Sequence, residues 1–497
     1  MANPTTYSGH VRSRTCPDGI TGSGYTQISS YVDNNALDWS AVSTVGKGWL
    51  LTSSNTSRWA LGALGNLANV PAVNGVQVND IKSGMNLGTF DTLQVMRQSM
   101  GQEVDMRVWA LGSGPRVGLG LKTLNRLAVD FNTGTFQGLQ DGSSNYMYLP
   151  ATPVPISFGV STGASTYTAT ARMYGWSNSF TKDSVDKSAA YGASSFWYVG
   201  GNGTTSAGQY RGAFCDGPRG YSSAISGANW ADYRDTWTPS RTLTLHPTNP
   251  AFVVVHIGTS RTAGWFTFGD DSWVGRIAQR YIGNSVHYNW GWPGVDAATL
   301  LANVSLYTAG LATLKSNWPN AMFVVILECG ANDAGADGRG TYPSASSYDN
   351  DLASFVFNLQ GAIGDNFRCL KMTSAPFCYP TSGNNSLSLT RQSNLDSYNA
   401  KDRLNAVYNG VIDVARHPTF ALSDSTFATL STMCKSSPYQ TGSSTDATPA
   451  AANYDGIHFG QNGNITMDTI LSQDPVFIAN VGGWAGIPIP LRLRIPA

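Results

Sequence analysis

The second half of the chain alternates between continuous apolar runs and stretches in which apolar residues have helical spacing. Residues 251–258 (AFVVVHIG) and 321–330 (AMFVVILECG) are apolar runs of strand length. Residues 272–283 and 296–318 show the mixed apolar and polar pattern of helices. Continuous Val, Ile and Leu runs are typical of parallel strands that helices bury on both faces.

The same alternation continues toward the C-terminus. The pattern predicts a helix over 348–364, a strand over 367–377 and a helix over 391–413. Strands separated by helical segments indicate a doubly wound, three-layer α/β/α domain with a mostly parallel sheet. Ligands of such sheets bind beyond the carboxyl ends of the strands, so polar residues that follow the apolar runs are candidates for a site.

The first half of the chain, up to about residue 245, shows little helical spacing. Short alternating runs over 166–176 and 194–201 predict strands between turns rich in Gly, Ser and Asn. Residues 92–112 are ambiguous, and a short helix is one interpretation of them. We therefore expect a β-rich N-terminal region ahead of the α/β domain.

Shifts in pattern divide the chain into four expected parts. Prolines cluster over residues 148–159, which favours a boundary between two β-rich modules. We expect 1–150 to be a structural, attachment or binding region and 151–245 to be an accessory module. The α/β domain is expected over 246–485, followed by a tail over 486–497.

The composition narrows the range of partners. Charged residues make up 12% of the 497 residues, about half of the usual share of roughly a quarter. Gly, Ser, Thr and Asn replace them, together with 14 Trp and 22 Tyr, and this mixture favours strands, turns and sugar-binding surfaces. The net charge is zero and no cluster of Lys and Arg occurs, which argues against nucleic acid as a partner.

No segment is apolar for long enough to span a bilayer, so we expect no membrane insertion. The N-terminal residues lack the apolar core of a secretory signal peptide, although the polar composition is typical of extracellular surfaces. A virion protein reconciles these two observations, because it assembles in the cytosol and leaves by lysis. A cytoplasmic enzyme and a protein exported without a signal remain alternatives.

The residue types of metal and glycosidase sites are poorly represented. Six scattered cysteines include no Cys-X-X-Cys pair, so we expect reduced thiols, no metal site and no cofactor. Glu328, Asp333, Asp270 and Asp271 do not form a convincing carboxylate pair for glycoside hydrolysis. His256 lies inside an apolar run and is interpreted as a core histidine.

Polar residues with catalytic potential follow the apolar runs and recur near the C-terminus. Ser260 follows the first run in IGTSRTAGW, and Asn332 and Asp333 follow the second in GAND. The later stretch DGIH has Asp455 three residues before His458. A serine hydrolase needs a nucleophile, a base, a residue that orients the base, and donors for the oxyanion. These residues fill every role together, whereas each motif by itself is more often a turn.

In this order, IGTSRTAGW, NWGWPG, GAND and DGIH resemble the blocks of the SGNH (GDSL-type) hydrolase family. The resemblance covers residues 247–483, about half of the chain. GAND and DGIH match the family pattern without change, whereas Thr259 replaces the aspartate of the commoner Gly-Asp-Ser. The resemblance implies the SGNH three-layer α/β/α fold and a serine ester hydrolase.

The resemblance also implies the donors of an oxyanion hole. Ser260 would be the nucleophile and would donate its own backbone N–H, and the Asn332 side-chain amide would be another donor. Gly294 would supply a further N–H, with Gly291 as the alternative because NWGWPG contains two glycines.

By the same resemblance, His458 would act as general base and then as general acid, with Asp455 orienting it. Trp290, Trp292 and Trp265 flank these blocks, so they are candidate substrate-binding residues together with Gly291. A place in the hydrophobic core is an equal alternative for the tryptophans, since Trp buries a large apolar area wherever it lies.

The favoured hypothesis is a carboxylic ester hydrolase that removes O-acetyl groups from a polysaccharide through an acyl-enzyme. In a virion tail it would act on host surface glycan. A receptor-binding or structural tail protein that uses the fold as an adhesin is one alternative, and a lipase or thioesterase is another. The expected partners are the polysaccharide or another ester substrate and other virion components. A homo-oligomer, a trimer by analogy with tail proteins, is a further expectation.

Overall fold

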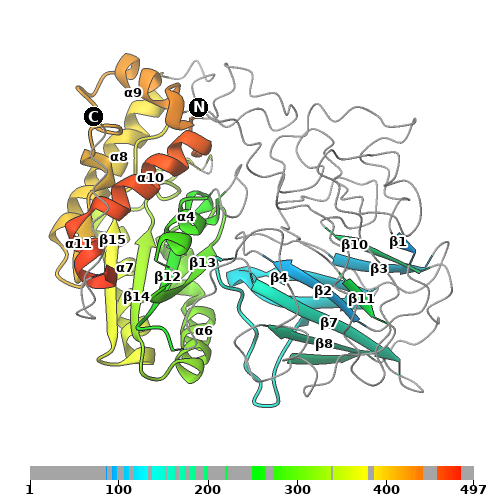
Figure 1. The fold of residues 1–497 in the computed structure, drawn as a ribbon. Coiled ribbons are helices and arrows are strands. Elements are labelled where there is room, and N and C mark those ends of the chain that lie inside the picture. The colour runs from blue at the N-terminus through cyan, green and yellow to red at the C-terminus, as the bar shows by residue number, and fades with distance from the viewer. Residues whose placement is uncertain are drawn as a thin grey trace, which may run out of the picture. The chain divides into compact units, whose positions relative to one another are not determined.

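The structure is a computed structural model of the chain. It describes residues 85–86, 92–97, 106–110, 117–131, 137–152, 154–162, 167–173, 180–184, 195–199, 219–221, 249–264, 272–281, 283–336, 338, 340–378, 385–439 and 456–482. The chain forms two compact units, one mainly of residues up to Leu245 and one mainly of residues from His246 onward. Figure 1 shows the elements of both units.

The described strands of the first unit form two antiparallel sheets. One sheet has the order β1-β10-β3-β4-β5-β6, and the other has the order β11-β2-β7-β8-β9. The first consists of β1 (Met85–Asn86), β10 (Ser195–Val199), β3 (Met106–Ala110), β4 (Val117–Lys122), β5 (Arg126–Phe131) and β6 (Gln137–Gly138), with the 3-10 turn η4 (Thr123–Asn125) between β4 and β5. The second consists of β11 (Arg219–Tyr221), β2 (Thr92–Arg97), β7 (Val154–Thr162), β8 (Tyr167–Met173) and β9 (Phe180–Ser184).

These strands agree with the β-rich character predicted for this half of the chain. The runs over 166–176 and 194–201 contain β8 and β10. The described parts of 92–112 are the strands β2 and β3, so the helical interpretation is wrong for those residues. Strands from both sides of residue 150 pair within one sheet, β3 with β10 and β2 with β7. The described strands therefore do not separate into two modules at that residue.

The second unit is built on a five-stranded sheet in which all strands are parallel. Its order is β13-β12-β14-β15-β16. The strands are β12 (Phe252–Gly258), β13 (Ser285–Gly291), β14 (Met322–Glu328), β15 (Phe367–Met372) and β16 (Gly410–Ile412). The predicted three-layer α/β/α fold with a mostly parallel sheet is thus confirmed for this unit.

Helices flank the sheet on both sides (Figure 1). The helix α4 packs against α10, and α5, α6 and α8 pack against α7. The α-helices are α3 (Ser260–Ala263), α4 (Trp273–Arg280), α5 (Ala297–Ala302), α6 (Val304–Asn317), α7 (Ala345–Ile363), α8 (Asn385–Leu404), α9 (Phe427–Cys434), α10 (Gln461–Gln473) and α11 (Pro475–Phe477). Shorter turns are η6 (Val414–Arg416), η7 (Ser437–Tyr439) and the π-type η8 (Ile478–Gly482).

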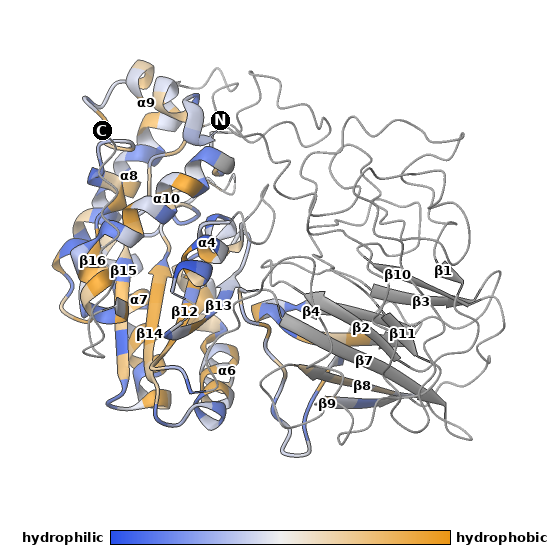
Figure 2. Ribbon diagram, in the orientation of Figure 1, coloured by the Kyte–Doolittle hydropathy of each residue, from blue (hydrophilic) through white to orange (hydrophobic). Residues whose placement is uncertain are grey.

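Local sequence explains where these elements begin and why they are buried. Every residue of β12 is buried, and Figure 2 shows the apolar character of the central strands β12 and β14. Ser272, Asp296 and Ser344 begin α4, α5 and α7, and the side chain of each accepts a hydrogen bond from a backbone N–H of the first turn. Such caps satisfy donors that the helix itself leaves unpaired.

Three details differ from the prediction. The strand β13 was not predicted, because its sequence SVHYNWG mixes polar and apolar residues, yet all of its residues are buried. The helix predicted over 296–318 is divided into α5 and α6 at Asn303. The helix predicted over 391–413 ends at Leu404, and the strand β16 lies in the last part of that predicted range.

The strand order creates a position where ligands bind in sheets of this kind. The chain passes from β12 to β13 on one side and then to β14 on the other side of β12. The two connections diverge beyond the carboxyl ends of β12 and β14, which is the topological switch point of a doubly wound sheet. Ser260 follows β12 and Asn332 follows β14, so the sheet brings both residues to this point.

Candidate active site

Ser260 is the first residue of the short helix α3, directly beyond β12. Its preceding residue Thr259 is the N-cap of that helix. Only 7% of Ser260 is exposed. This strand-to-helix corner therefore presents the serine hydroxyl at the carboxyl edge of the sheet in a nearly enclosed position.

The buried carboxylate of Glu328, the last residue of β14, holds this corner. Its Oε2 accepts hydrogen bonds from the Thr259 hydroxyl at 2.6 Å, the Thr259 N–H at 3.2 Å and the Thr262 hydroxyl at 3.2 Å. Its Oε1 accepts from the Ser374 hydroxyl at 3.2 Å. An aspartate at position 259 would direct a second carboxylate at Glu328. The structure thereby gives a physical reason for threonine at this position.

Asn332 and Asp333 hold the turn that follows β13. The Asn332 amide Nδ2 donates to the carbonyl of Val295 at 2.7 Å, and Asp333 Oδ1 accepts from the N–H of Ala297 at 3.0 Å. Asp333 Oδ2 also accepts from the Cys329 thiol at 3.4 Å, and burial raises the pKa of Asp333 to about 6. An amide NH₂ has two hydrogens, so Asn332 can donate a second bond while it holds this turn.

The two glycines of NWGWPG have different surroundings. Gly291 ends β13, and its N–H donates to Asn289 Oδ1 at 3.0 Å. A Cβ on Gly291 would lie 2.2 Å from the backbone nitrogen of Ala263, so this position requires glycine for the close approach of α3. Gly294 has φ +80° in the turn that the bond from Val295 N–H to the Trp292 carbonyl closes, and a Cβ there would meet open space.

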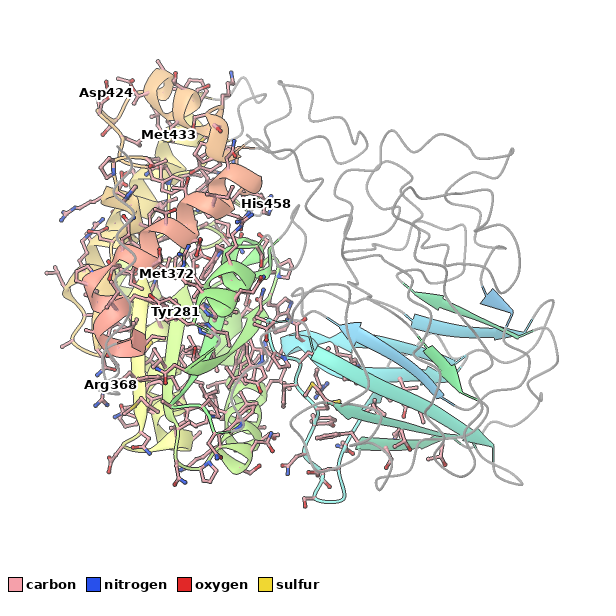
Figure 3. The ribbon with its side chains drawn as sticks, in the orientation of Figure 1. Tyr281, Arg368, Met372, Asp424, Met433 and His458 are labelled. Atoms are coloured by element: carbon pink, nitrogen blue, oxygen red, sulfur yellow. The ribbon has the colours of Figure 1, made fainter. Side chains whose placement is uncertain are left out.

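His458 comes from a segment far from Ser260 in sequence. Its Nε2 lies 2.8 Å from Ser260 Oγ, although the two residues are 198 positions apart. Figure 3 shows His458 at the end of the sheet toward which the strand arrows point. Asp455, the residue expected to orient His458, lies outside the described residues. The structure therefore brings a hydroxyl and an imidazole into the geometry of a nucleophile and its base.

The candidate substrate-binding tryptophans differ in where the structure places them. Trp290 is fully buried and its ring lies 6.4 Å from Tyr288 and 6.3 Å from Tyr307, between centroids. It therefore belongs to the hydrophobic core, which corrects its inclusion among the substrate-binding candidates. Trp292 is half-buried, beyond the end of β13, and stays a candidate. Trp265 lies outside the described residues.

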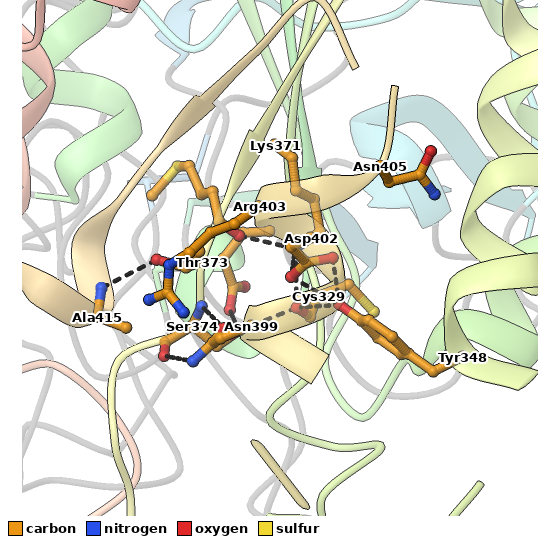
Figure 4. Close-up of polar contacts among 12 residues, drawn as sticks. Cys329, Tyr348, Lys371, Thr373, Ser374, Asn399, Asp402, Arg403, Asn405 and Ala415 are labelled. Carbon is orange, nitrogen blue, oxygen red and sulfur yellow. Dashed lines mark hydrogen bonds and ion pairs between the residues drawn. The ribbon is translucent and has the colours of Figure 1, made fainter. Parts of the chain in front are cut away.

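A buried polar network supports the start of the Asn332 turn (Figure 4). Lys371 Nζ forms a fully buried ion pair with Asp402 at 2.9 Å and donates to the Cys329 carbonyl at 3.1 Å. The Tyr348 hydroxyl donates to the same carbonyl at 3.0 Å. Burial raises the pKa of Asp402 to about 6. The Ser374 hydroxyl lies 3.0 Å from the same carbonyl, so three donors surround the carbonyl from which the chain enters GAND.

Two other histidines form a pair inside the sheet. His256 of β12 and His287 of β13 are buried, with His256 Nε2 lying 2.9 Å from His287 Nδ1. Burial lowers the pKa of His287 to about 3 and lowers the pKa of His256 well below its usual value. Both rings are therefore neutral near pH 7 and lie in the core, which agrees with the interpretation of His256.

Three further observations concern the described residues. Among the described residues, no group of three or more His, Cys, Asp or Glu is arranged to hold a metal ion. None of the helices that the structure describes is both long and apolar enough to cross a membrane. The cysteines in the described part of the chain, Cys329, Cys369, Cys378 and Cys434, are free and buried.

Sequence reasoning missed two residues that hold this site together, Arg261 and Glu328. Arg261 has 3% of its surface exposed, as has Glu328. Each appeared as an ordinary charged residue beside a motif. The only local signal was a charged residue in a segment otherwise expected to be buried, which is rare unless hydrogen-bonded partners exist.

The chain matches no family model, and a search of curated proteins finds no match. Solved structures with similarity to it include a member of the lipolytic protein G-D-S-L family from Veillonella parvula DSM 2008, at 14% identity over 45% of this chain and 98% of that chain, with a TM-score of 0.30. Others are the acetyl xylan esterase AlAXEase, at 16% identity over 44% and 98% with a TM-score of 0.30, and TesA, at 14% over 45% and 99% with a TM-score of 0.29. With TM-scores this low, the functional assignment depends on the geometry of the site itself.

Proposed function

We propose that this chain is a serine carboxylic ester hydrolase with Ser260 as the nucleophile and His458 as the general base. The observation that carries the proposal is the 2.8 Å separation of Ser260 Oγ and His458 Nε2. Position adds support, because the pair lies at the switch point of a parallel sheet beside the Asn332 amide. A hydroxyl at this distance from an imidazole can transfer its proton as it attacks an acyl carbon.

The proposed reaction has two halves. Ser260 Oγ attacks the ester carbonyl while His458 takes its proton, and the resulting tetrahedral intermediate expels an alcohol that receives this proton. Water then attacks the acyl-enzyme with His458 again as the base, and a carboxylic acid leaves. Asp455 is proposed to orient the imidazole and to stabilise its protonated form.

The proposed oxyanion donors are the backbone N–H of Ser260, the backbone N–H of Gly294 and the amide of Asn332. Gly294 is preferred over Gly291 because the N–H of Gly291 already donates to Asn289 Oδ1. The bond between Asn332 and Val295 supports this set, since it fixes the Gly294 turn against the Asn332 turn before substrate binds. Donors fixed in advance are worth more than donors that must reorganise during the reaction.

The finer proposal is that the substrate is an O-acetylated polysaccharide, met by a virion tail on a host surface. Its support is the composition of the chain, which is poor in charge and rich in Gly, Trp and Tyr. Comparing p-nitrophenyl acetate with the decanoate separates this proposal from a lipase or thioesterase, because an acetyl pocket excludes the long chain. Binding of the inactive Ser260→Ala protein to a glycan array would reveal a role as an adhesin.

The proposed nucleophile is tested with p-nitrophenyl acetate. Ser260→Ala should lower kcat by about 10⁴-fold or more, because no acyl-enzyme can form. Asn332→Ala should lower kcat by about 10²–10³-fold, the usual effect of losing one oxyanion donor. Unchanged circular dichroism would show that both variants are folded. Full activity in the Ser260→Ala variant would overturn the proposal.

A further inference from the structure

Arg261, the residue directly after Ser260, is almost completely buried, with 3% of its surface exposed. A buried guanidinium is strongly unfavourable unless hydrogen bonds replace the water that it loses. Its place inside the four-residue helix α3 ties its backbone to that of the nucleophile. The contacts of this side chain therefore show which segments are attached to the strand-to-helix corner at Ser260.

Three backbone carbonyls accept hydrogen bonds from the guanidinium. Nε donates to Ile457 at 2.7 Å, Nη1 donates to Ala375 at 2.8 Å, and Nη2 donates to Pro376 at 3.2 Å. Ile457 precedes His458, and Ala375 and Pro376 lie in the segment that follows β15. One planar side chain thus joins three segments, and only the fork of an arginine presents donors in these directions together.

The guanidinium also contacts Phe459, the residue that follows the histidine. Its Cζ lies 5.0 Å from the centroid of the Phe459 ring, within the range of a cation–π contact. Both neighbours of His458 in sequence are therefore held by Arg261, one through its carbonyl and one through its ring. The N–H of Cys378 donates to the Gly456 carbonyl at 3.1 Å and attaches the same loop to the segment after β15.

We propose that Arg261 is a positioning residue, which fixes the loop of residues 456–460 so that His458 Nε2 meets Ser260 Oγ. The claim that Arg261 fixes this loop is based on these contacts, whereas the expected effect on rate rests on the proposed function. The base reaches the site on a loop, so its orientation depends on side-chain contacts of this kind. Small displacements of reacting groups cost rate without a matching loss of substrate binding.

The test compares Arg261→Met, which keeps the length but removes the donors, with Arg261→Lys, which keeps the charge and one donor group. Arg403→Met is the matched control, because Arg403 is a partly buried arginine whose two-bond ion pair is made with Asp413 and not with the histidine loop. Each variant is crystallised, and hydrogen exchange is measured for the amides of residues 456–460. Turnover of p-nitrophenyl acetate is measured alongside.

In Arg261→Met, we expect Ser260 Oγ and His458 Nε2 to move beyond hydrogen-bond distance and loop exchange to rise about tenfold or more. We expect kcat to fall about 10- to 100-fold with KM within about threefold, and Arg261→Lys to recover part of the loss. The control should change none of these. An unchanged Ser260–His458 distance and unchanged loop exchange in Arg261→Met would overturn the positioning role. Inactivity of the wild-type protein would instead refute the proposed function, and the distance and exchange would still decide the role of Arg261.

Discussion

The two sides of the candidate site are held in place in different ways. On the sheet-borne side, Ser260, Gly294 and Asn332 each follow a parallel strand, and their segments are hydrogen-bonded to one another through Glu328 and through the Asn332 amide. On the loop-borne side, His458 lies in the loop of residues 456–460 before α10. That loop is held by the Arg261 guanidinium and by backbone bonds to Cys378 and Pro438. The Asn464 amide and the rings that pack on Phe459 also hold it.

This difference leads us to expect that substitutions on the two sides differ in whether they mainly affect the free energy of unfolding or mainly affect kcat. The sheet-borne side shares its contacts with the core of the domain, so changes to the residues that support it, as distinct from the reacting groups themselves, should mainly lower the free energy of unfolding. The loop-borne side carries the base on a loop outside the sheet, so changes to the residues that hold this loop should mainly lower kcat. The predictions below test the sheet-borne side, and the Arg261 variants test the loop-borne side.

The largest expected loss of stability follows from Lys371→Met. This change leaves the Asp402 carboxylate buried without its cation and removes a donor from the Cys329 carbonyl. Breaking a buried pair in this way costs about 3–5 kcal/mol. Urea denaturation followed by circular dichroism measures the change in the free energy of unfolding.

The control for this change is the double variant Lys371→Met with Asp402→Leu. It removes both charges, so it should be clearly more stable than Lys371→Met alone. Equal stability of the single variant and the wild type would show that the network does not support the sheet-borne side.

The next prediction concerns the residue that departs from Gly-Asp-Ser. Thr259→Asp places a carboxylate against Glu328, whose Oε2 lies 2.6 Å from the Thr259 hydroxyl. We expect it to lose about 1–3 kcal/mol of stability, the usual cost of a disrupted buried polar contact, and to lower kcat. Thr259→Ser keeps the hydroxyl and should behave like the wild type. A Thr259→Asp variant as stable as the wild type would contradict this account of the threonine.

The smallest predicted effect is a dependence on pH. Burial lowers the pKa of His287 to about 3, so below pH 6.5 the unfolded chain binds a proton that the folded chain does not. The free energy of unfolding should therefore fall as the pH falls below 6.5, by up to about 1.4 kcal/mol per pH unit for this histidine. His287→Gln should reduce the loss between about pH 6.5 and pH 5, measured by urea denaturation.

The comparison with His287→Gln isolates the histidine from groups that act in the opposite direction. The pKa of Asp333 and that of Asp402 are each raised to about 6, so these carboxyls favour the folded state as the pH falls. Both are retained in the variant. An identical dependence on pH in the two proteins would mean that His287 is accessible to protons in the folded chain.

The sequence was most informative where a local pattern decides the structure. Apolar runs predicted β12, β14 and β15, and the residues that follow β12 and β14 are those that the fold brings together. The strand β13 was not predicted because polar residues are uncommon in a buried strand. His287 is partnered by His256 on the neighbouring strand β12. Asn289 accepts a hydrogen bond from the N–H of Gly291, which becomes apparent only in the folded chain.

Arg261 could not be recognised for a related reason. Its acceptors lie 114, 115 and 196 positions away, so no local pattern records them. The same holds for Glu328, which meets Thr259 across 69 positions. Motif order could indicate which residues react, whereas the residues that hold them in place depend on tertiary contacts.

The central claim is that Ser260 is a nucleophile activated by His458, and covalent trapping tests it most directly. The protein is treated with diethyl p-nitrophenyl phosphate, and its peptides are examined by mass spectrometry. We predict one diethylphosphoryl group on Ser260 of the wild-type protein, with p-nitrophenolate released in equal amount, and none in Ser260→Ala or His458→Ala. An unmodified Ser260 in the wild type, or equal labelling of the His458→Ala variant, would contradict the claim.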